Sequence, residues 1–457
     1  MEQVTQFQLT IEYLQSLKEA IARADKEFIT TSLADANTAD VSDVLEEFNA
    51  ADSKFILDLL DEKVSAEVIN GLEVDIRVKF LKIFTPGEAA KYISHLDSDD
   101  AVDILSEVPL KFREETIPHI KNKEKARNII DLLRYDDDCA GGLMAKELIK
   151  TNINWNIHQT IEEIRRQAEN VQKIFSVYVV DDNNHLLGRV SLKALILAND
   201  GMKIEDIYES DIESVPTYME EEEVAVIMSK YDLEAIPVIN VQGQLLGRIT
   251  IDDIVDVITE QAEEDMQLMS GLSTEPEDDD SVWSLTKARI PWLVIGLAGG
   301  LLGARFLGFF EEELQHITAI AFFIPLIMAT GGNAGIQSST LVVQSLANPS
   351  AFEENISKKL LKVVAVALIN GILLSAIVFV SVYLLMANDY KLAFVVAFAL
   401  FSVVLLASVL GTIIPLILDR IGVNPALASG PFITTANDLV GLGVYFTVVH
   451  FLYSYSY

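Results

Sequence analysis

Apolar positions in residues 1–135 recur three and four residues apart, in short stretches separated by Asp, Pro or Gly. This spacing is typical of amphipathic α-helices, and the separators indicate that each helix ends after a few turns. We therefore expect an all-α domain built as a stack of short helical hairpins. The stretches that carry the pattern are VSDVLEEFNA, KFILDLLDEKVSAEVINGL, VDIRVKFLKIF, EAAKYISHL and DDAVDILSEV.

The pattern changes to alternating strands and helices after a turn-rich segment at residues 134–144. Residues 175–196 align with residues 234–255, and the tetrapeptide Leu-Leu-Gly-Arg occurs at 186–189 and again at 245–248. Each copy predicts a strand, a hairpin turn, a second strand and a helix. Two copies 59 residues apart resemble a tandem pair of cystathionine-β-synthase (CBS) domains, a regulatory α/β module.

An acidic helical connector follows, with breaks predicted near Ser270-Gly271 and Glu275-Pro276 and an acidic run at residues 277–280. Five apolar stretches come after it, each long enough to cross a bilayer. They cover residues 287–308, 317–346, 360–387, 392–418 and 426–453. The chain therefore predicts four parts: the helical domain at 1–135, the CBS pair at 136–260, the connector at 261–284 and an all-α transmembrane domain of five helices at 285–457.

The charged residues are distributed unequally between residues 1–282 and residues 283–457. The 457 residues carry a formal net charge of −34, yet residues 283–457 hold eight acidic and eight basic side chains. Residues 1–282 therefore contain the entire excess, with 60 acidic and 26 basic residues. Such acidity excludes nucleic acid as a partner and suits cations, although a single surface acid is more often present for solubility.

Compartment and orientation follow from a few residues. Cys139 is the only cysteine, which fits a reducing cytosol, and the first residues lack the basic and apolar regions of a signal peptide. Lysine and arginine are concentrated before the first span and in every second loop between the spans. Because such loops face the cytoplasm, we expect a cytoplasmic N-terminus and a C-terminus outside the cell (inner) membrane. These basic residues are Lys287, Arg289, Lys358, Lys359, Lys362 and Arg420.

The second apolar stretch is crowded with small and polar residues, in FFIPLIMATGGNAGIQSSTLVVQSLAN. Small residues let helices approach closely, which is a purely structural interpretation. Alternatively, amides and freed backbone carbonyls line a water-filled path, where irregular backbone is tolerated at membrane depth. Asn333 and Gln337 lie four residues apart and share a helix face. The number of amides and hydroxyls favours the path.

Asp438 lies within the last apolar stretch. A charged carboxylate at the bilayer centre costs about 2.5–3.5 kcal/mol on the insertion scale. If Asp438 has only a structural role, its carboxyl would be protonated or paired with a group on another helix. Pro415 and Pro431 predict that these helices are broken or kinked. Arg305 is the only basic side chain expected at comparable depth, and it lies shallow enough to snorkel. A mobile cation is therefore the expected partner of Asp438.

Magnesium gives up its water shell reluctantly, so a pore for it should offer a carboxylate with carbonyls and amides that hydrogen-bond those waters. Asp438, Asn333 and the Thr434 carbonyl supply such groups. No cluster of His and Cys indicates zinc, copper or iron. The chemistry alone leaves magnesium, manganese, calcium and cobalt open.

The whole chain resembles the MgtE family of magnesium channels and transporters. The resemblance rests on RYDDDCAGGLM, PLIMATGGNAGIQSSTL, GVNPALASGP and TTANDLVGLGVYF. It implies a homodimer whose pore lies on the dimer axis, lined by the second and fifth spans, with Asp438 holding hydrated Mg²⁺. It also implies regulatory Mg²⁺ ions that close the channel when cytosolic magnesium is high. The matching positions are Glu67, Asp99, Glu220, Glu222, Asp232, Asp253, Asp256, Glu264 and Asp265.

Three positions depart from the family pattern. Asn424 stands where an aspartate is often found, which leaves a weaker ion site at the pore entrance. Gln261 replaces an acid on the connector, and Gln344 stands where a basic residue is frequent. The CBS resemblance also implies an ATP site. Its ribose-binding pattern is kept by Thr250 and Asp253 but lost in the first copy, and Tyr178 would stack on the base.

Two other classes of function remain open from the sequence. One is a coupled transporter or exporter of other divalent cations, such as Co²⁺ or Mn²⁺, and the other is a membrane-anchored CBS sensor without transport. A coupled transporter would need further carboxylates within the membrane besides Asp438. A sensor without transport would not require the polar residues of the second span. We do not expect an enzyme, because the sequence has no nucleophile–base set and no phosphate-binding loop.

Overall fold

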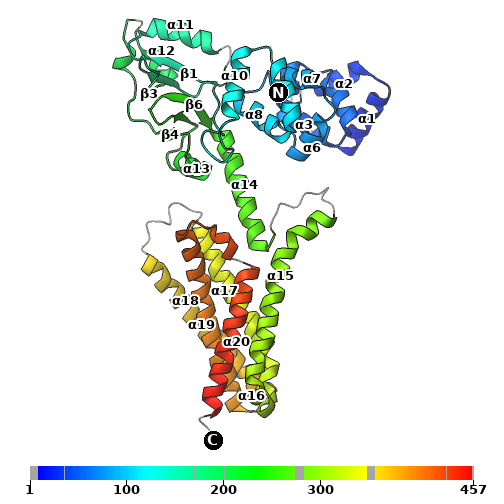
Figure 1. Cartoon of the computed structure of the whole chain (residues 1–457), viewed down its shortest axis with the longest axis vertical. Coiled ribbons are helices and arrows are strands. Elements are labelled where there is room, and N and C mark those ends of the chain that lie inside the picture. The colour runs from blue at the N-terminus through cyan, green and yellow to red at the C-terminus, as the bar shows by residue number, and fades with distance from the viewer. Residues whose placement is uncertain are drawn as a thin grey trace, which may run out of the picture. The chain divides into compact units, whose positions relative to one another are not determined.

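The computed structural model describes residues 9–34, 36–168, 171, 173–199, 201–272, 282–346, 356–386, 388–428 and 430–454. The chain forms two compact units, residues 1–258 and 259–457, and each has its own hydrophobic core (Figure 1). The predicted break at Glu275-Pro276 and the acidic run at residues 277–280 lie outside the described residues.

Short helices make up the first part of the N-terminal unit, as the sequence predicts. Most begin at an Asn, Asp or Thr whose side chain accepts a hydrogen bond from the first-turn backbone, for example at Asn49, Asp61 and Thr85. From Thr10 to Asp61 such a cap recurs every 12 to 15 residues, and each cap marks the start of a new short helix. The helices are α1 (Ile11–Ala22), α2 (Lys26–Leu33), α3 (Thr38–Glu46), α4 (Ala50–Leu57), α5 (Glu62–Asn70), α6 (Val74–Leu81), α7 (Pro86–Ile93), α8 (Ser98–Glu107), α9 (Leu110–Thr116) and α10 (Lys123–Leu132).

Two three-stranded sheets follow, one for each copy of the repeat. In each sheet the first two strands are parallel and the last two form the predicted antiparallel hairpin. The elements of the first copy are β1 (Ile149–Asn152), α11 (Ile157–Gln167), β2 (Val177–Val180), β3 (Leu186–Val190) and α12 (Leu192–Leu197). Those of the second are β4 (Val215–Pro216), α13 (Glu221–Lys230), β5 (Ala235–Ile239), β6 (Leu245–Thr250) and α14 (Ile251–Ser270). The α/β CBS pair is confirmed.

The repeated Leu-Leu-Gly-Arg has a structural cause. A Cβ atom at Gly188 would lie 2.1 Å from the Glu209 carbonyl oxygen, and one at Gly247 would lie 2.6 Å from the Ala145 carbonyl oxygen. Each glycine therefore lets a neighbouring backbone segment pass close to its strand. The arginine that follows then bonds to that same segment through its backbone: Arg189 with Glu209, and Arg248 with Ala145.

The helical domain and the second CBS copy share one core. Buried apolar side chains of the helices, among them Leu105 and Ile129, belong to the same cluster as Val224 and Ile236 of the second copy. The first copy has a separate core around Val177 and Val190. Helix α14 then continues without a break from the end of β6 to Ser270, where Gly271 ends it with a φ of +75°.

The membrane unit contains five helices of sufficient length and apolarity to cross a bilayer, counted over the described residues. They correspond to the five predicted stretches. The elements are α15 (Val282–Leu307), α16 (Glu311–His316), α17 (Ile324–Leu346), α18 (Ile356–Leu385), α19 (Tyr390–Arg420) and α20 (Pro431–Ser454), with short 3₁₀ turns at Gly308–Phe310, Thr318–Phe323 and Pro425–Ala428.

The structure corrects two expectations about these helices. Helix α19 continues through Pro415, so it is not broken there, and Pro431 is the first residue of α20, a position where proline costs no hydrogen bond. Helix α17 is also continuous across its glycines, so its backbone carbonyls are not freed.

Glycines set the closest approach between membrane helices. A Cβ atom at Gly411 on α19 would lie 2.3 Å from the carbonyl oxygen of Gly335 on α17, and one at Gly335 would lie 1.7 Å from the Asn437 amide nitrogen on α20. The structural interpretation of the small residues therefore holds for this crossing of α17, α19 and α20.

We expect Gly411→Ala to lower the stability of the membrane unit by about 1–3 kcal/mol, because the added methyl forces two backbones apart. Gly300→Ala is the matched control, since nothing lies within 4 Å of a Cβ atom there. Thermal unfolding of the detergent-solubilised chain measures the difference. Equal melting temperatures for the two variants would contradict this packing.

Candidate functional site

A cavity of about 780 Å³ lies beside the first turns of α20 in the membrane unit. Asp438, Thr434 and Thr435 line it from α20, while Arg289 and Trp292 line it from α15. The residues that end α14 also contribute to its wall. The carboxylate of Asp438 is half-buried, two turns into its helix, so it reaches a space large enough for a hydrated ion.

Arg289 corrects one expectation from the sequence. Arg305 is exposed on α15, whereas Arg289 lines the same cavity as Asp438. Between these two described side chains no ion pair forms within 4.0 Å. The sequence signal was ambiguous, because Arg289 also fits a basic residue that flanks a span. A fixed cation thus lies on the cavity wall without neutralising the carboxylate.

Not all of the other predicted pore residues line the cavity with Asp438. Thr434 is in the first turn of α20, where its hydroxyl donates to the Gly430 carbonyl at 2.9 Å. Asn333 and Gln337 share an exposed face of α17, as predicted, while Gly335 on the opposite face is buried. Neither amide is among the residues that line the cavity with Asp438. Within one chain, the two predicted polar surfaces are therefore separate.

Asn424 uses both ends of its amide. Its nitrogen donates to a carboxylate oxygen of Asp265 on α14 at 3.1 Å, and its oxygen accepts from the Ala426 backbone N–H at 2.8 Å. An amide donor satisfies a carboxylate directly, whereas two carboxylates in this position would repel. The contact between these two predicted metal residues is complete without an ion.

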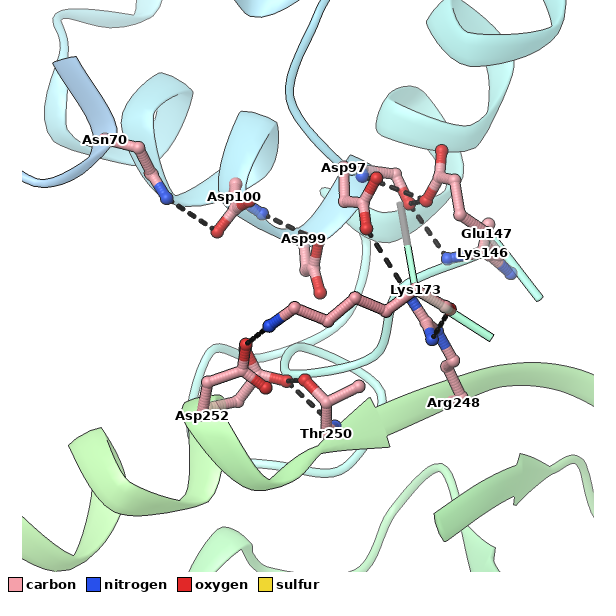
Figure 2. Close-up of polar contacts among 12 residues, drawn as sticks. Asn70, Asp97, Asp99, Asp100, Lys146, Glu147, Lys173, Arg248, Thr250 and Asp252 are labelled. Carbon is pink, nitrogen blue, oxygen red and sulfur yellow. Dashed lines mark hydrogen bonds and ion pairs between the residues drawn. The ribbon is translucent and has the colours of Figure 1, made fainter. Parts of the chain in front are cut away.

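An acidic cluster forms where the start of α8 faces the start of α14 (Figure 2). Asp99 is buried, and the charges of Asp253, Asp100 and Asp97 all act on it. Asp253 already accepts hydrogen bonds from the backbone N–H and the hydroxyl of Thr250, at 2.9 and 2.8 Å. The structure thus brings Asp99 and Asp253 together, from segments 154 residues apart in the sequence.

Burial makes these carboxylates poor acids. It raises the pKa of Asp97 to about 6, helped by Glu147 and opposed by Arg248. Burial also raises the pKa of Asp253 to about 6 and holds the pKa of Asp99 well above its usual range. Desolvated carboxylates with too few cations bind either a proton or a metal ion. In the described part of the chain, no three His, Cys, Asp or Glu side chains converge as a ready metal site.

The remaining predicted sensor acids are not in this cluster. Glu67 lies on α5, one turn before Asn70, whose amide bonds to Asp100 at 2.9 Å. The others are exposed: Glu220, Glu222 and Asp232 at the ends of α13, and Asp256 and Glu264 on α14. Sequence reasoning missed Asp97, Asp100 and Asp252. Their signal was present in the runs Asp97-Ser-Asp-Asp and Asp252-Asp253, but only the fold brings the two runs together.

One of the predicted nucleotide residues, Tyr178, lies at a narrow crevice in the CBS pair. Tyr178, Phe175 and Arg248 line it, and the space between them is narrower than a water molecule. The Tyr178 hydroxyl and the Arg248 Nε are buried without a hydrogen-bond partner among the described residues. Thr250 and Asp253 bond to each other instead of presenting free groups to a ribose. A nucleotide therefore requires this crevice to widen.

Three family profiles match the chain in order. Residues 36–138 match the MgtE intracellular N domain, residues 140–201 and 204–260 match the CBS domain, and residues 324–448 match MgtE, described as a divalent cation transporter. Magnesium transporter MgtE of Thermus thermophilus is 31% identical over 447 residues, which cover 96% of this chain and 98% of the relative.

The chain belongs to the MgtE family. A second MgtE relative, from Enterococcus faecalis, is 34% identical over 73% of each chain. The crystal structure of the soluble part of a magnesium transporter covers 55% of this chain and 98% of its own at 28% identity, with a TM-score of 0.50. The crystal structure of the cytosolic domain of the Mg²⁺ channel MgtE in complex with ATP covers 53% of this chain and 99% of its own. It is 29% identical, with a TM-score of 0.50.

Family membership and fold class are thus as the sequence predicts, and the five apolar helices make this MgtE chain a multi-pass membrane protein. The match to the N-domain profile begins at residue 36, so helices α1 and α2 lie before it. The acidic cluster joins the segments matched by the N-domain and second CBS profiles.

We expect the packed, metal-free acidic cluster to gain stability as pH falls from about 6 towards 4. The carboxyls of Asp97 and Asp253 have folded pKa values near 6, above the ordinary value of 3.8, so the folded state binds protons first. Each can contribute up to about 1.4 kcal/mol per pH unit in that window. Calorimetric unfolding in EDTA measures the slope.

Asp99→Asn should flatten this slope, while Asp43→Asn, at an exposed position on α3, should leave it unchanged. Saturating Mg²⁺ should weaken or reverse the slope, because protons then displace the metal. A metal-free stability that rises with pH between 4 and 6 would contradict the prediction.

Proposed function

We propose that this chain is a homodimeric Mg²⁺ channel that imports Mg²⁺ through the cell membrane and is closed by Mg²⁺ bound to its cytosolic part. The observation that carries the proposal is Asp438, a carboxylate that lines a cavity inside the membrane unit without a salt-bridge partner among the described residues. Relatives that cover most of the chain are named magnesium transporters.

The transport step follows from the chemistry of hydrated Mg²⁺. The ion holds its waters tightly, so a carboxylate binds it through that shell and needs space around it. The cavity beside Asp438 supplies the space, and the hydroxyls of Thr434 and Thr435 add polar groups to its wall. In a homodimer, two copies of Asp438 and the exposed α17 amides Asn333 and Gln337 would face the axis together.

The proposed division of labour follows the four predicted parts. Residues 1–135 and 136–260 sense magnesium, residues 261–284 transmit the change, and residues 285–457 conduct. The lysines and arginines between the spans favour a cytoplasmic N-terminus and an outer C-terminus. Import is then the direction in which a cytosolic sensor can act as negative feedback.

Closure by magnesium follows from electrostatics. Two subunits of −34 each repel, and a divalent ion between acidic faces removes the repulsion and stabilises the packed form. The buried Asp99 beside Asp253 is the strongest candidate for such a contact. Asp100 supplies further charge, whereas the Asp252 carboxylate lies 4.0 Å from the Lys173 ammonium. The secondary candidates are Glu67, Glu220, Glu222, Asp232, Asp256, Glu264 and Asp265.

ATP is a candidate second ligand, because a cytosolic domain of the family was solved in complex with it. We propose that ATP binds only after the crevice at Tyr178 widens. Asp253 would then have to serve either the nucleotide or the metal, since its carboxylate already caps α14 through Thr250.

The Asp438 proposal predicts that Asp438→Asn and Asp438→Ala reduce Mg²⁺ flux into proteoliposomes by about tenfold to a hundredfold, the cost of a lost charge-assisted hydrogen bond. Asp389→Asn is the matched control, because asparagine caps α19 as well as aspartate does. Equal flux in all variants would remove Asp438 from the mechanism. An active wild type that prefers Co²⁺ or Mn²⁺ would favour the exporter alternative, and no flux at all would favour a sensor.

The gating proposal predicts that Asp99→Asn and Asp253→Asn each raise the internal Mg²⁺ concentration for half-closure by about tenfold, because one charged ligand is lost. The maximal flux at low internal Mg²⁺ should stay unchanged. Asp43→Asn again serves as the exposed control. A closure midpoint that does not move in the two cluster variants would reject this cluster as the sensor.

A further inference from the structure

The cavity beside Asp438 contains one fixed positive charge, which has no part in the transport step proposed above. Of the twelve residues that line the cavity, only Asp438 and Arg289 carry a formal charge. They lie on different helices, α20 and α15, and these two described side chains form no ion pair within 4.0 Å. An ion in this space is therefore attracted by one wall and repelled by the other.

Helix packing places Arg289 on this wall. Helix α15 contacts α20 at Gly299, where a Cβ atom would lie 2.0 Å from the Thr435 Cγ2 atom. Arg289, Trp292 and Leu293 precede this contact on α15 and line the cavity. Residues three and four apart share a helix face, so these three side chains follow one another along the same wall. The side chain of Arg289 is exposed, and it therefore stays in contact with water.

The charge of Arg289 opposes the binding of any cation at Asp438. An arginine stays protonated at physiological pH, so this repulsion is permanent. By Coulomb's law, the repulsion is twice as large for a divalent ion as for a monovalent ion at the same place. Because the guanidinium is exposed, water screens part of its field. We therefore expect Arg289 to lower the Mg²⁺ affinity of the site by a factor of about three.

Two other basic residues of α15 lie elsewhere. Lys287, two residues before Arg289, is exposed and does not line the cavity. Arg305, near the other end of the helix, is also exposed and does not line it. A basic residue that only flanks a membrane span acts through its charge near the surface, whichever helix face it occupies. The position on the cavity wall is therefore what distinguishes Arg289 from Lys287.

We propose that Arg289 sets a weak affinity for Mg²⁺ at Asp438, so that the ion binds there and then leaves. Conduction needs a site that attracts the ion and still releases it. In a homodimer, two copies of Asp438 alone would hold a divalent ion tightly, and two copies of Arg289 reduce that attraction. This inference rests on the proposed channel function, because it concerns the affinity of the same site.

The test measures how the single-channel current of the full-length chain saturates with external Mg²⁺. The current through an open channel does not depend on how often the channel opens, so closure by cytosolic Mg²⁺ does not affect the comparison. Arg289→Gln should lower the half-saturating Mg²⁺ concentration about threefold. Arg289→Lys should keep it near the wild-type value, because the positive charge remains. Lys287→Gln is the matched control and should leave it unchanged.

A moved charge separates electrostatics from local packing. Leu293 lies one turn after Arg289 on the same cavity wall, and its side chain is exposed. Adding Leu293→Lys to the Arg289→Gln chain should restore the wild-type half-saturating concentration. Leu293→Lys alone should raise that concentration about threefold, which tests the proposal even where Arg289→Gln fails to fold.

Three results would overturn the proposal. One is the same saturation curve for Arg289→Gln and Lys287→Gln. Another is a lower maximal current in Arg289→Gln at an unchanged half-saturating concentration, which is the result of a purely structural role. The third is a double variant that keeps the values of Arg289→Gln. A wild type without any Mg²⁺ current would overturn the proposed channel function and this inference with it, whereas the three results above require a conducting wild type and overturn the inference alone.

Discussion

Carboxylates buried without enough fixed cations are the constraint on which this molecule depends. Removing a carboxylate from water is costly, and the cost is recovered only by a proton, a basic side chain or a metal ion. The acidic cluster at Asp99 and the membrane carboxylate Asp438 both meet this condition. Under the proposed function, each site is most stable when a mobile cation occupies it, and that preference would couple ion concentration to structure.

Some of these carboxylates have a protein group as a partner and others do not. At the start of α8, Arg248 supplies a permanent cation for Asp97, and at the end of α14 the amide of Asn424 satisfies Asp265 directly. Both contacts are made by protein groups alone. Between them lie Asp99 on α8 and Asp253 on α14, which form no ion pair within 4.0 Å among the described residues.

Packing and polarity are divided between the two faces of α17. Gly335 and Ser339 face inward, where α19 and α20 approach too closely for larger side chains, and Asn333 and Gln337 face outward. The structural interpretation of this segment holds for the inner face, and the water-filled path stays a proposal for the outer face. A continuous helix can serve both, because its period of 3.6 residues separates the faces.

The sequence by itself determined the helical domain, the CBS repeat, the five apolar spans and the isolation of Asp438, because all of these are local patterns of periodicity, length and charge. It also singled out Asp99 and Asp253 through resemblance. It could not place Arg289 on the wall beside Asp438, keep α19 continuous through Pro415, or join Asp97 to Arg248, 151 residues away. Those outcomes were decided by tertiary structure, since burial and the distance between charges depend on which segments pack together.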